Sequence, residues 1–226
     1  MKVSYISYDF GEYSIRLASA LAAEAQVSLH LPADSAAPHR YRLNEAVRFQ
    51  PFAKPRLRQP VAQLRTIYGL LRQIAAFQPD VIHLQQGHFW FNLALPFLRR
   101  YPLVITIHDP RHHMGDSGSH NTPQGLIDFG FRRADRVIVH GQQMRKMVVD
   151  ELKLRPDRIH VIPHIVLGND ADQQDVPQED NLVLFFGRIW AYKGLEYLIK
   201  AESLISAAHT SRNTKSVRFT SGGAPP

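Results

Sequence analysis

The chain has 226 residues, of which 44% are hydrophobic and 21% charged, a composition typical of folded globular domains. This length suits one full domain and part of a second. The absence of cysteine excludes a disulfide scaffold, a thiolate metal site and a cysteine nucleophile. The short apolar opening is interrupted by Asp9, and the longest apolar stretch is about half the roughly 20 residues of a membrane span. We therefore expect a cytoplasmic protein without a signal peptide.

Short apolar runs alternate with amphipathic segments along the first three quarters of the chain. The runs predict strands at Lys2–Ser7, Gln26–Leu31, Val47–Phe52, Val81–Gln85, Leu103–His108, Arg136–His140 and Arg158–Pro163. The segments between them predict helices at Glu12–Ala25, Val61–Phe77, Phe89–Arg99, Pro123–Arg133 and Gln142–Leu154. Strands and helices that alternate in this way predict an α/β fold, with a Rossmann-like, doubly wound parallel sheet.

Three details of these helices can be predicted from single residues. The Val61–Phe77 helix has Val61, Leu64, Ile67, Leu71 and Ile74 at the spacing of one buried face. Proline predicts a kink at Pro96. Thr122 is expected as the N-cap of the next helix, with Pro123 as its first helical residue.

The remainder of the chain changes in character. Residues 1–167 form the predicted Rossmann-like domain, and the acidic segment 168–181 is expected to be a linker. Residues 182–205 predict one apolar strand and one helix, the opening of an incomplete second domain. The tail 206–226 is rich in serine and threonine, without apolar periodicity, and is expected to be disordered.

The positive charge of the chain is concentrated in one segment. Residues 40–72 contain eight arginine or lysine residues and one acid, so this segment has a net charge of +7, equal to that of the whole chain. Arg58, Arg65 and Arg72 recur every seven residues and share one helix face. The segment is either an ordinary solvated face or a surface for an anionic partner such as a membrane.

Histidines end four successive predicted strands, at His83, His108, His140 and His164. Because ligands of open α/β sheets bind at the carboxyl ends of the strands, these side chains suit a hydroxyl-rich ligand or acid–base chemistry. The alternative is that each imidazole satisfies nearby backbone groups.

Other candidate sites are weaker. The loop around His108 contains Asp109, His112, His113, Asp116 and His120, whose residue types suit zinc, yet no metal-binding signature is present and we expect no metal. Gly11 follows the first strand and is a lone glycine that would let a phosphate or sugar approach. Arg188 and Lys193 follow the strand that ends at Gly187, where two cations suit a diphosphate or are simply exposed.

The segment GRIWAYKGLEYLIKA resembles the G-R-x4-K-G-x3-L-I-x-A motif that opens the second domain of family 4 (group 1) glycosyltransferases. PDVIHLQ, LVITIHD, RRADRVIVHGQQMRK and DRIHVIPH resemble the first domain of that family in order and spacing. The resemblance covers residues 2–205. It implies a GT-B architecture in which the first domain binds the acceptor and the second binds a nucleotide sugar.

The resemblance also implies roles for single residues. Gly187, Arg188 and Lys193 would contact the donor diphosphate, and His108 would lie near the reacting sugar. Gly11 matches the glycine loop after the first strand of the family. We assign it to the acceptor side together with Asp109 and the strand-end histidines His83, His140 and His164. The reaction would retain the anomeric configuration, with the nucleotide sugar as substrate and without a cofactor or metal.

The Glu-x7-Glu element of the family is absent from this sequence. We therefore expect a glycosyltransferase-like fragment with little activity alone, which a shifted reading frame after residue 205 or a second chain completing the fold would explain. The expected partners are a nucleotide sugar, a glycan or lipid-linked acceptor and, through residues 40–72, the inner face of an anionic membrane, but no nucleic acid. A non-catalytic module that binds a glycan, an anionic lipid or a partner subunit is the alternative, and a metal hydrolase is a third hypothesis.

Overall fold

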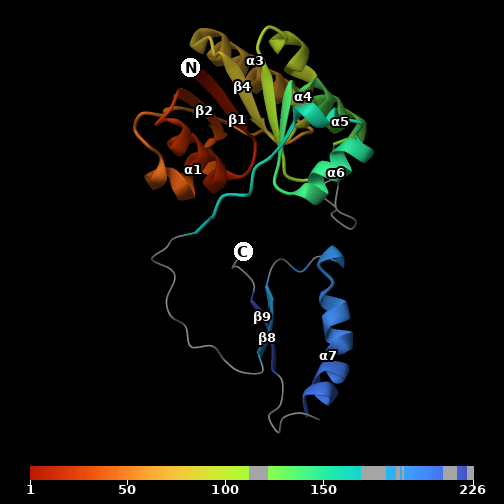
Figure 1. Cartoon of the computed structure of the whole chain (residues 1–226). Helices are drawn as coiled ribbons and strands as arrows, with labels where there is room; N and C mark the ends of the chain where they lie inside the picture. Colours follow the sequence, from red (N-terminus) through yellow and green to blue (C-terminus); the bar gives the residue numbers. More distant parts are fainter. Residues whose placement is uncertain (112–121, 169–181, 187–188, 190, 211–217, 223–226) are drawn as a thin grey trace. The chain divides into compact units, whose positions relative to one another are not determined.

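A computed structural model shows two compact units in the chain (Figure 1). The structure describes residues 1–111, 122–168, 182–186, 189, 191–210 and 218–222. The first unit holds residues 1–111 and 121–167, and the second holds the described residues from Gly168 onward.

The first unit is built on a seven-stranded sheet in which every neighbouring pair is parallel. The strand order is β3-β2-β1-β4-β5-β6-β7, so the first strand lies inside the sheet, between β2 and β4 (Figure 1). The strands are β1 (Lys2–Ser7), β2 (Gln26–Pro32), β3 (Arg48–Phe52), β4 (Val81–Gln85), β5 (Leu103–Ile107), β6 (Arg136–Val139) and β7 (Ile159–Val161).

Two apolar clusters show that helices cover both faces of this sheet. The helices are α1 (Gly11–Leu21), α2 (Ala33–Ala36), α3 (Pro60–Phe77), α4 (Phe89–Ala94), α5 (Gln124–Arg133) and α6 (Gln142–Asp150). In one cluster, α1 and α2 pack against Val3 and Tyr5 of β1. In the other cluster, the four helices α3, α4, α5 and α6 pack against Ile6 of β1 and against strands β4 to β7. Since successive side chains of a strand point to opposite faces, the sheet is doubly wound, as predicted.

The buried face of α3 differs from the predicted one. Val61 and Leu64 are 62% and 59% exposed, while Gln63 is fully buried with Ile67 and Ile74. Gln63 is tolerated there because its Nε2 donates a hydrogen bond of 2.7 Å to the Pro55 carbonyl oxygen. The apolar residues at the start of α3 are therefore on the surface, and the predicted face is wrong at that end.

The two predicted effects of proline are found in modified form. The α-helix α4 ends at Ala94 and continues as a 3-10 turn over Leu95–Leu98, which contains Pro96. Helix α5 begins one residue later than predicted, at Gln124, because Pro123 has an extended ψ of 130° and is itself the N-cap.

The second unit contains a two-stranded parallel sheet, β8 (Leu182–Phe186) with β9 (Arg218–Gly222), and a helix, α7 (Leu195–Thr210). This differs from the disordered tail expected from residue 206, since α7 continues to Thr210 and β9 lies within that tail. Phe219 and Thr220 are residue types that favour strands, and in the pairing with β8 they lie opposite Val183 and Leu184. The expected linker, apart from Gly168, lies outside the described residues.

None of the helices in the described ranges combines the length and the apolar character that crossing a bilayer requires.

Candidate functional site

The carboxyl ends of three neighbouring strands bring His108, His140 and His164 together. His108 directly follows β5, His140 directly follows β6, and His164 lies three residues after β7. The ring centroids are 4.8 Å apart for His108 and His140, and 4.9 Å apart for His140 and His164. One ring nitrogen from each of the three lies within 4.8 Å of the others. We call these three residues the histidine cluster.

Two aromatic residues from the segment after β1 pack against the histidine cluster. The ring of Phe10 stacks on that of His108 with the centroids 4.1 Å apart. The ring centroids of Tyr13 and His164 are 4.8 Å apart. Phe10 has a φ of 60°, a left-handed conformation that costs a residue with a side chain of this size strain energy. Tyr13 is 5% exposed and belongs to the first turn of α1. The sequence prediction missed both residues.

Hydrogen bonds orient two of the three imidazoles. Nδ1 of His140 lies 3.0 Å from the Ile162 carbonyl oxygen, and Nδ1 of His164 lies 2.7 Å from that of Ile165. A carbonyl oxygen only accepts hydrogen bonds, so Nδ1 carries the proton in both rings. In the neutral rings, Nε2 therefore keeps its lone pair.

The site favours neutral imidazole at His108. Burial, followed by the neighbouring imidazoles of His140 and His164, lowers the pKa of His108 to about 3. Nε2 of His108 is buried and has no hydrogen-bond partner among the residues that the structure describes. Such a group is suited to accept a hydrogen bond from a bound hydroxyl or to bind a cation.

His83 does not join the histidine cluster, although the sequence predicted four histidines at one edge. It lies within β4, where its Nε2 is 2.8 Å from Oγ1 of Thr106 and its ring packs at 4.9 Å from Tyr5. Burial lowers the pKa of His83 to about 4. Its contacts are those of a histidine satisfied inside the sheet.

Gln86 holds the segment that follows β5. Its Oε1 accepts a hydrogen bond of 2.9 Å from the His108 amide, and its Nε2 donates one of 2.8 Å to the Asp109 carbonyl oxygen. Gln86 itself has a φ of 53°. Asp109 is exposed next to His108. The sequence analysis missed Gln86, for which its place directly after a buried strand was the available signal.

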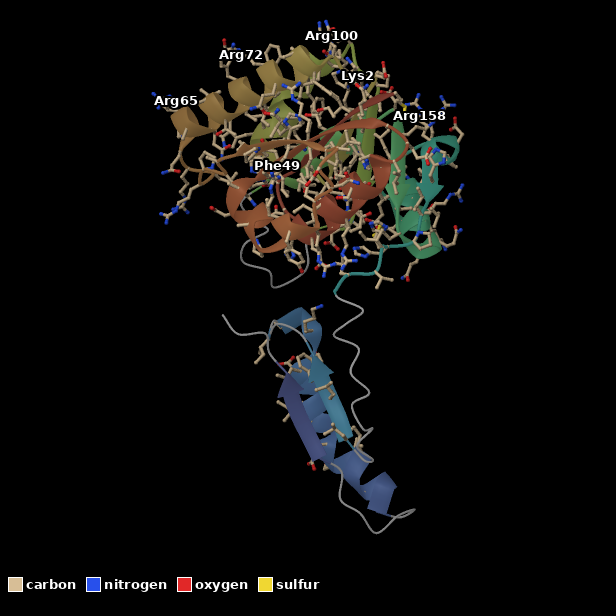
Figure 2. All side chains as sticks on the ribbon, turned by 90° about the vertical axis from the view of Figure 1, so that its left-hand side faces the viewer. Lys2, Phe49, Arg65, Arg72, Arg100 and Arg158 are labelled. Carbon is tan, nitrogen blue, oxygen red and sulfur yellow. The ribbon has the colours of Figure 1, made fainter. Side chains whose placement is uncertain are left out.

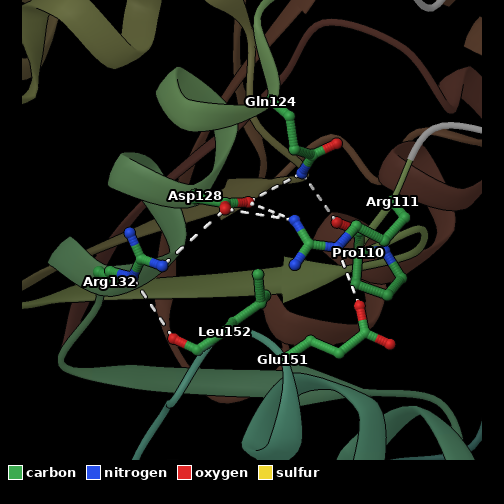
Figure 3. Close-up of polar contacts among 7 residues, drawn as sticks. All are labelled: Pro110, Arg111, Gln124, Asp128, Arg132, Glu151 and Leu152. Carbon is green, nitrogen blue, oxygen red and sulfur yellow. Dashed lines mark hydrogen bonds and ion pairs between the residues drawn. The ribbon is translucent and has the colours of Figure 1, made fainter.

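An ionic network holds Arg111, two residues after Asp109 in the segment that follows β5 (Figure 3). The Arg111 guanidinium lies 3.2 Å from a carboxylate oxygen of Asp128 in α5 and 2.9 Å from Glu151. Gln124 donates hydrogen bonds both to Asp128 and to the Pro110 carbonyl oxygen. The side chain of Asp128 is 11% exposed, so this pair is screened less than a surface pair. The network holds Arg111, the last described residue before position 122. His112, His113, Asp116 and His120, whose residue types suit zinc, lie outside the described residues.

Gly11 has a packing role in the structure. A Cβ at this position would lie 2.0 Å from the carbonyl oxygen of Ser35 in α2. The close approach of α1 and α2 therefore requires glycine here.

The predicted donor residues are described only in part. Lys193 is exposed at the end of a 3-10 turn over Ala191–Lys193, directly before α7. Gly187 and Arg188 lie outside the described residues.

The basic segment 40–72 lies on the surface of the first unit. Arg65 and Arg72 project from α3, across the unit from Arg158 (Figure 2). The exposed side chains Val61, Leu64 and Tyr68 of the same helix are 59–64% accessible. Elsewhere in the segment, charges have partners within the chain, as Lys54 does with Asp9 at 2.6 Å.

A groove of about 700 Å³ lies elsewhere, along β6, β7 and α6. Its lining residues are Val104, Arg136, Ile138, Gln142, Arg145, Ile159, His160, Val161 and Ile162. None of the predicted site residues lines this groove, so its size does not make it the better candidate.

Comparison with known sequences decides the family. The sequence profile of glycosyltransferase family 4 matches residues 11–166, more than half of the chain. The chain belongs to this family. A D-inositol 3-phosphate glycosyltransferase of Nocardiopsis dassonvillei is 26% identical over 176 residues, which cover 70% of this chain and 41% of the relative. The family 4 chain thus spans about two fifths of the length of this curated relative.

Solved structures agree with the family 4 assignment at the level of the fold. A glycosyltransferase of Rickettsia africae has a TM-score of 0.59 at 12% identity, over 99% of this chain and 68% of that one. A UDP-GlcNAc 2-epimerase of Methanocaldococcus jannaschii has a TM-score of 0.57 at 13% identity, over 97% and 65% of the two chains. These likenesses confirm the predicted GT-B, Rossmann-like fold class.

Proposed function

We propose that this family 4 chain takes part in the transfer of a sugar from a nucleotide sugar to a hydroxyl acceptor, with retention of the anomeric configuration. The observation that carries the proposal is the histidine cluster, which lies at the carboxyl edge of the parallel sheet in a chain of this family. Ligands of open α/β sheets bind at this edge.

Four residues of the first unit have a role in this proposal. Nε2 of His108 accepts a hydrogen bond from a hydroxyl of the reacting sugar or of the acceptor, and His140 and His164 orient the acceptor beside it. Asp109, the next residue along the chain, contacts the same ligand. Hydrogen bonds from a fixed, partly buried site position a hydroxyl more strongly than exposed groups do, because less water competes.

The donor belongs to the second unit in this proposal. Arg188 and Lys193 bind the diphosphate, and Gly187, the residue before Arg188, contacts it as well. Their positive charge stabilises the leaving nucleoside diphosphate as the glycosidic bond breaks. The nucleotide sugar is consumed as a substrate, and the scheme uses no cofactor.

The name of the Nocardiopsis dassonvillei relative suggests the class of acceptor. A phosphorylated cyclic polyol offers several hydroxyl groups for the imidazoles. D-inositol 3-phosphate is therefore the acceptor probe that we propose.

The test is the histidine NMR spectrum of the chain in the presence of a chelator. We expect D-inositol 3-phosphate to shift the ring signals of the histidine cluster and to leave those of His160, an exposed residue of β7, in place. His140→Gln is expected to weaken this binding at least tenfold, and His160→Gln to leave it unchanged. Shifts confined to His160, or no shifts at millimolar probe, would contradict the acceptor role. A transfer product whose anomeric configuration is opposite to that of its donor would contradict the proposed retention.

A second function, contact with an anionic membrane, is favoured by the surface of α3. The exposed apolar side chains Leu64 and Tyr68 lie on the same helix as Arg65 and Arg72. Apolar groups that insert beside cations are the usual means by which a helix binds a lipid surface. This surface would bring the active site to a lipid-linked acceptor.

Vesicle flotation tests this second function. We expect the chain to bind phosphatidylglycerol vesicles but not phosphatidylcholine vesicles, and to dissociate as the salt concentration rises. The double variant Arg65→Glu/Arg72→Glu is expected to lose most of this binding. Arg158→Glu is the matched control with the same kind of charge reversal elsewhere on the unit. Equal losses in the two variants would mean that net charge, and not α3, is responsible.

A further inference from the structure

The ring nitrogens that the proposed sugar transfer offers to a hydroxyl group can instead bind a metal ion. Three imidazoles from three different strand ends present one nitrogen each to a common point, all within 4.8 Å of one another. We propose that His108, His140 and His164 bind one transition-metal ion of the Zn²⁺ class, with a fourth coordination position open to an oxygen ligand.

The hydrogen bonds of two rings leave the required atoms available. A metal-binding imidazole uses one nitrogen for the ion and donates the N–H of the other to a fixed acceptor. His140 and His164 make this second contact through Nδ1, to the Ile162 and Ile165 carbonyl oxygens. Nε2 is then the metal ligand in both. Main-chain acceptors hold the rings in this tautomer before any ion binds.

The third ring, that of His108, also has a nitrogen without a hydrogen-bond partner among the described residues. Nε2 of His108 and Nε2 of His140 are both buried and have no hydrogen-bond partner among the described residues. Burial of a polar nitrogen without a hydrogen-bond partner costs free energy. A metal ion would satisfy both nitrogens at once.

The distances require only a small rearrangement. In a tetrahedral zinc site with Zn–N bonds near 2.0–2.1 Å, neighbouring ligand nitrogens are about 3.4 Å apart. The cluster nitrogens lie within 4.8 Å of one another, so each pair needs to approach by at most about 1.4 Å. His164 follows β7 by three residues and is the most exposed of the three, so it can move without disturbing the sheet.

The composition of the cluster indicates what the fourth position binds. The three ligands are neutral, so the ion keeps its charge of +2, which attracts water or the oxygen of an anionic ligand. Phe10 and Tyr13 line one side of the cluster with aromatic rings. This site spans three strand ends and differs from a zinc site within the loop after β5.

Cobalt spectroscopy of the whole 226-residue chain tests the proposal directly. The chain is prepared without a histidine tag, stripped with EDTA, freed of the chelator and titrated with Co²⁺. We expect intense visible absorption of tetrahedral Co²⁺ that saturates at one equivalent and disappears when one equivalent of Zn²⁺ is added. Weak, unsaturable absorption of octahedral Co²⁺ would overturn the proposal.

Variants assign the absorption to the cluster. His164→Gln changes an exposed side chain and is expected to fold normally and to weaken Co²⁺ binding at least tenfold. His160→Gln, an exposed position in β7 itself, is expected to bind as the unmodified chain does. Equal binding by His164→Gln and the unmodified chain would overturn the proposal. The titration contains neither donor nor acceptor, so its outcome is independent of the proposed sugar transfer.

Discussion

The two units bury their strands to very different extents. In the first unit, Leu84 of β4 is fully buried, and strands on either side pair with β4. In the second unit, Leu184 of β8 is 58% exposed, and other large apolar side chains are exposed with it: Leu182, Ile189, Tyr197, Ile199 and Leu204. Two strands and one helix cannot enclose two apolar faces, whereas seven strands with helices on both sides can. Burial by neighbouring layers, and not the apolar sequence of a strand alone, therefore determines how much that strand stabilises its unit.

The most direct way to break this comparison is to truncate one leucine in each unit. Leu84→Ala is expected to lower the free energy of unfolding by about 3 kcal/mol, because it removes buried methyl groups and leaves a cavity. Leu184→Ala is expected to change it by less than about 0.5 kcal/mol. Urea unfolding followed by circular dichroism measures both. Similar losses for the two variants would mean that β8 is buried as deeply as β4.

The dependence of stability on pH sharpens the comparison, since it reports on buried polar groups of the first unit. Burial lowers the pKa of His30 in β2 to about 4, although its hydrogen bond to Gln73 of α3 opposes the shift. The unfolded chain, with a histidine pKa near 6.5, binds this proton first, so stability falls as pH decreases from about 6.5 to 4. The loss is expected to be on the order of 2–3 kcal/mol.

His30→Gln tests this assignment. The variant is expected to lose stability at pH 7, because it changes a buried group, but to show a smaller loss between pH 6.5 and 4. The measurement is urea unfolding at a series of pH values. An unchanged pH dependence in the variant would assign the loss to other histidines.

The smallest expected effect concerns ion pairs within the first unit. Asp128→Asn weakens the pair with Arg111 and is expected to cost about 1–2 kcal/mol, because the carboxylate is largely buried. Arg155 and Asp157 form a pair at 2.8 Å in which both side chains are exposed, so Arg155→Gln is the control without a measurable effect. Thermal unfolding of the two variants distinguishes them. A larger loss for Arg155→Gln would mean that burial does not govern the strength of these pairs.

The periodicity of the sequence predicted the parallel sheet, and the strand-end positions of His108, His140 and His164 predicted that these three side chains would lie together. These predictions succeeded because the carboxyl ends of parallel strands meet at one edge, a rule that needs no tertiary detail. The prediction that His83 would join them was wrong, because His83 lies inside β4 and its side chain contacts Thr106 of the next strand.

Other features depend on contacts between distant residues and could not be predicted. The buried face of α3 includes Gln63 because the Pro55 carbonyl oxygen is close enough to accept its hydrogen bond. Gly11 is required by Ser35, which is 24 residues away along the chain. The left-handed backbone of Phe10 and Gln86 has no signal in residue type, since neither is a glycine or an asparagine.

The place of β1 in the sheet also has a consequence for biosynthesis. Val3 of β1 pairs with Val81 of β4, so one edge of the first strand stays unpaired until β4 has left the ribosome. At roughly 5–20 residues per second, this interval is about 4–16 s. An open edge with apolar side chains is a site for chaperones and for aggregation. The yield of folded chain is therefore expected to depend on the speed of translation between these two strands.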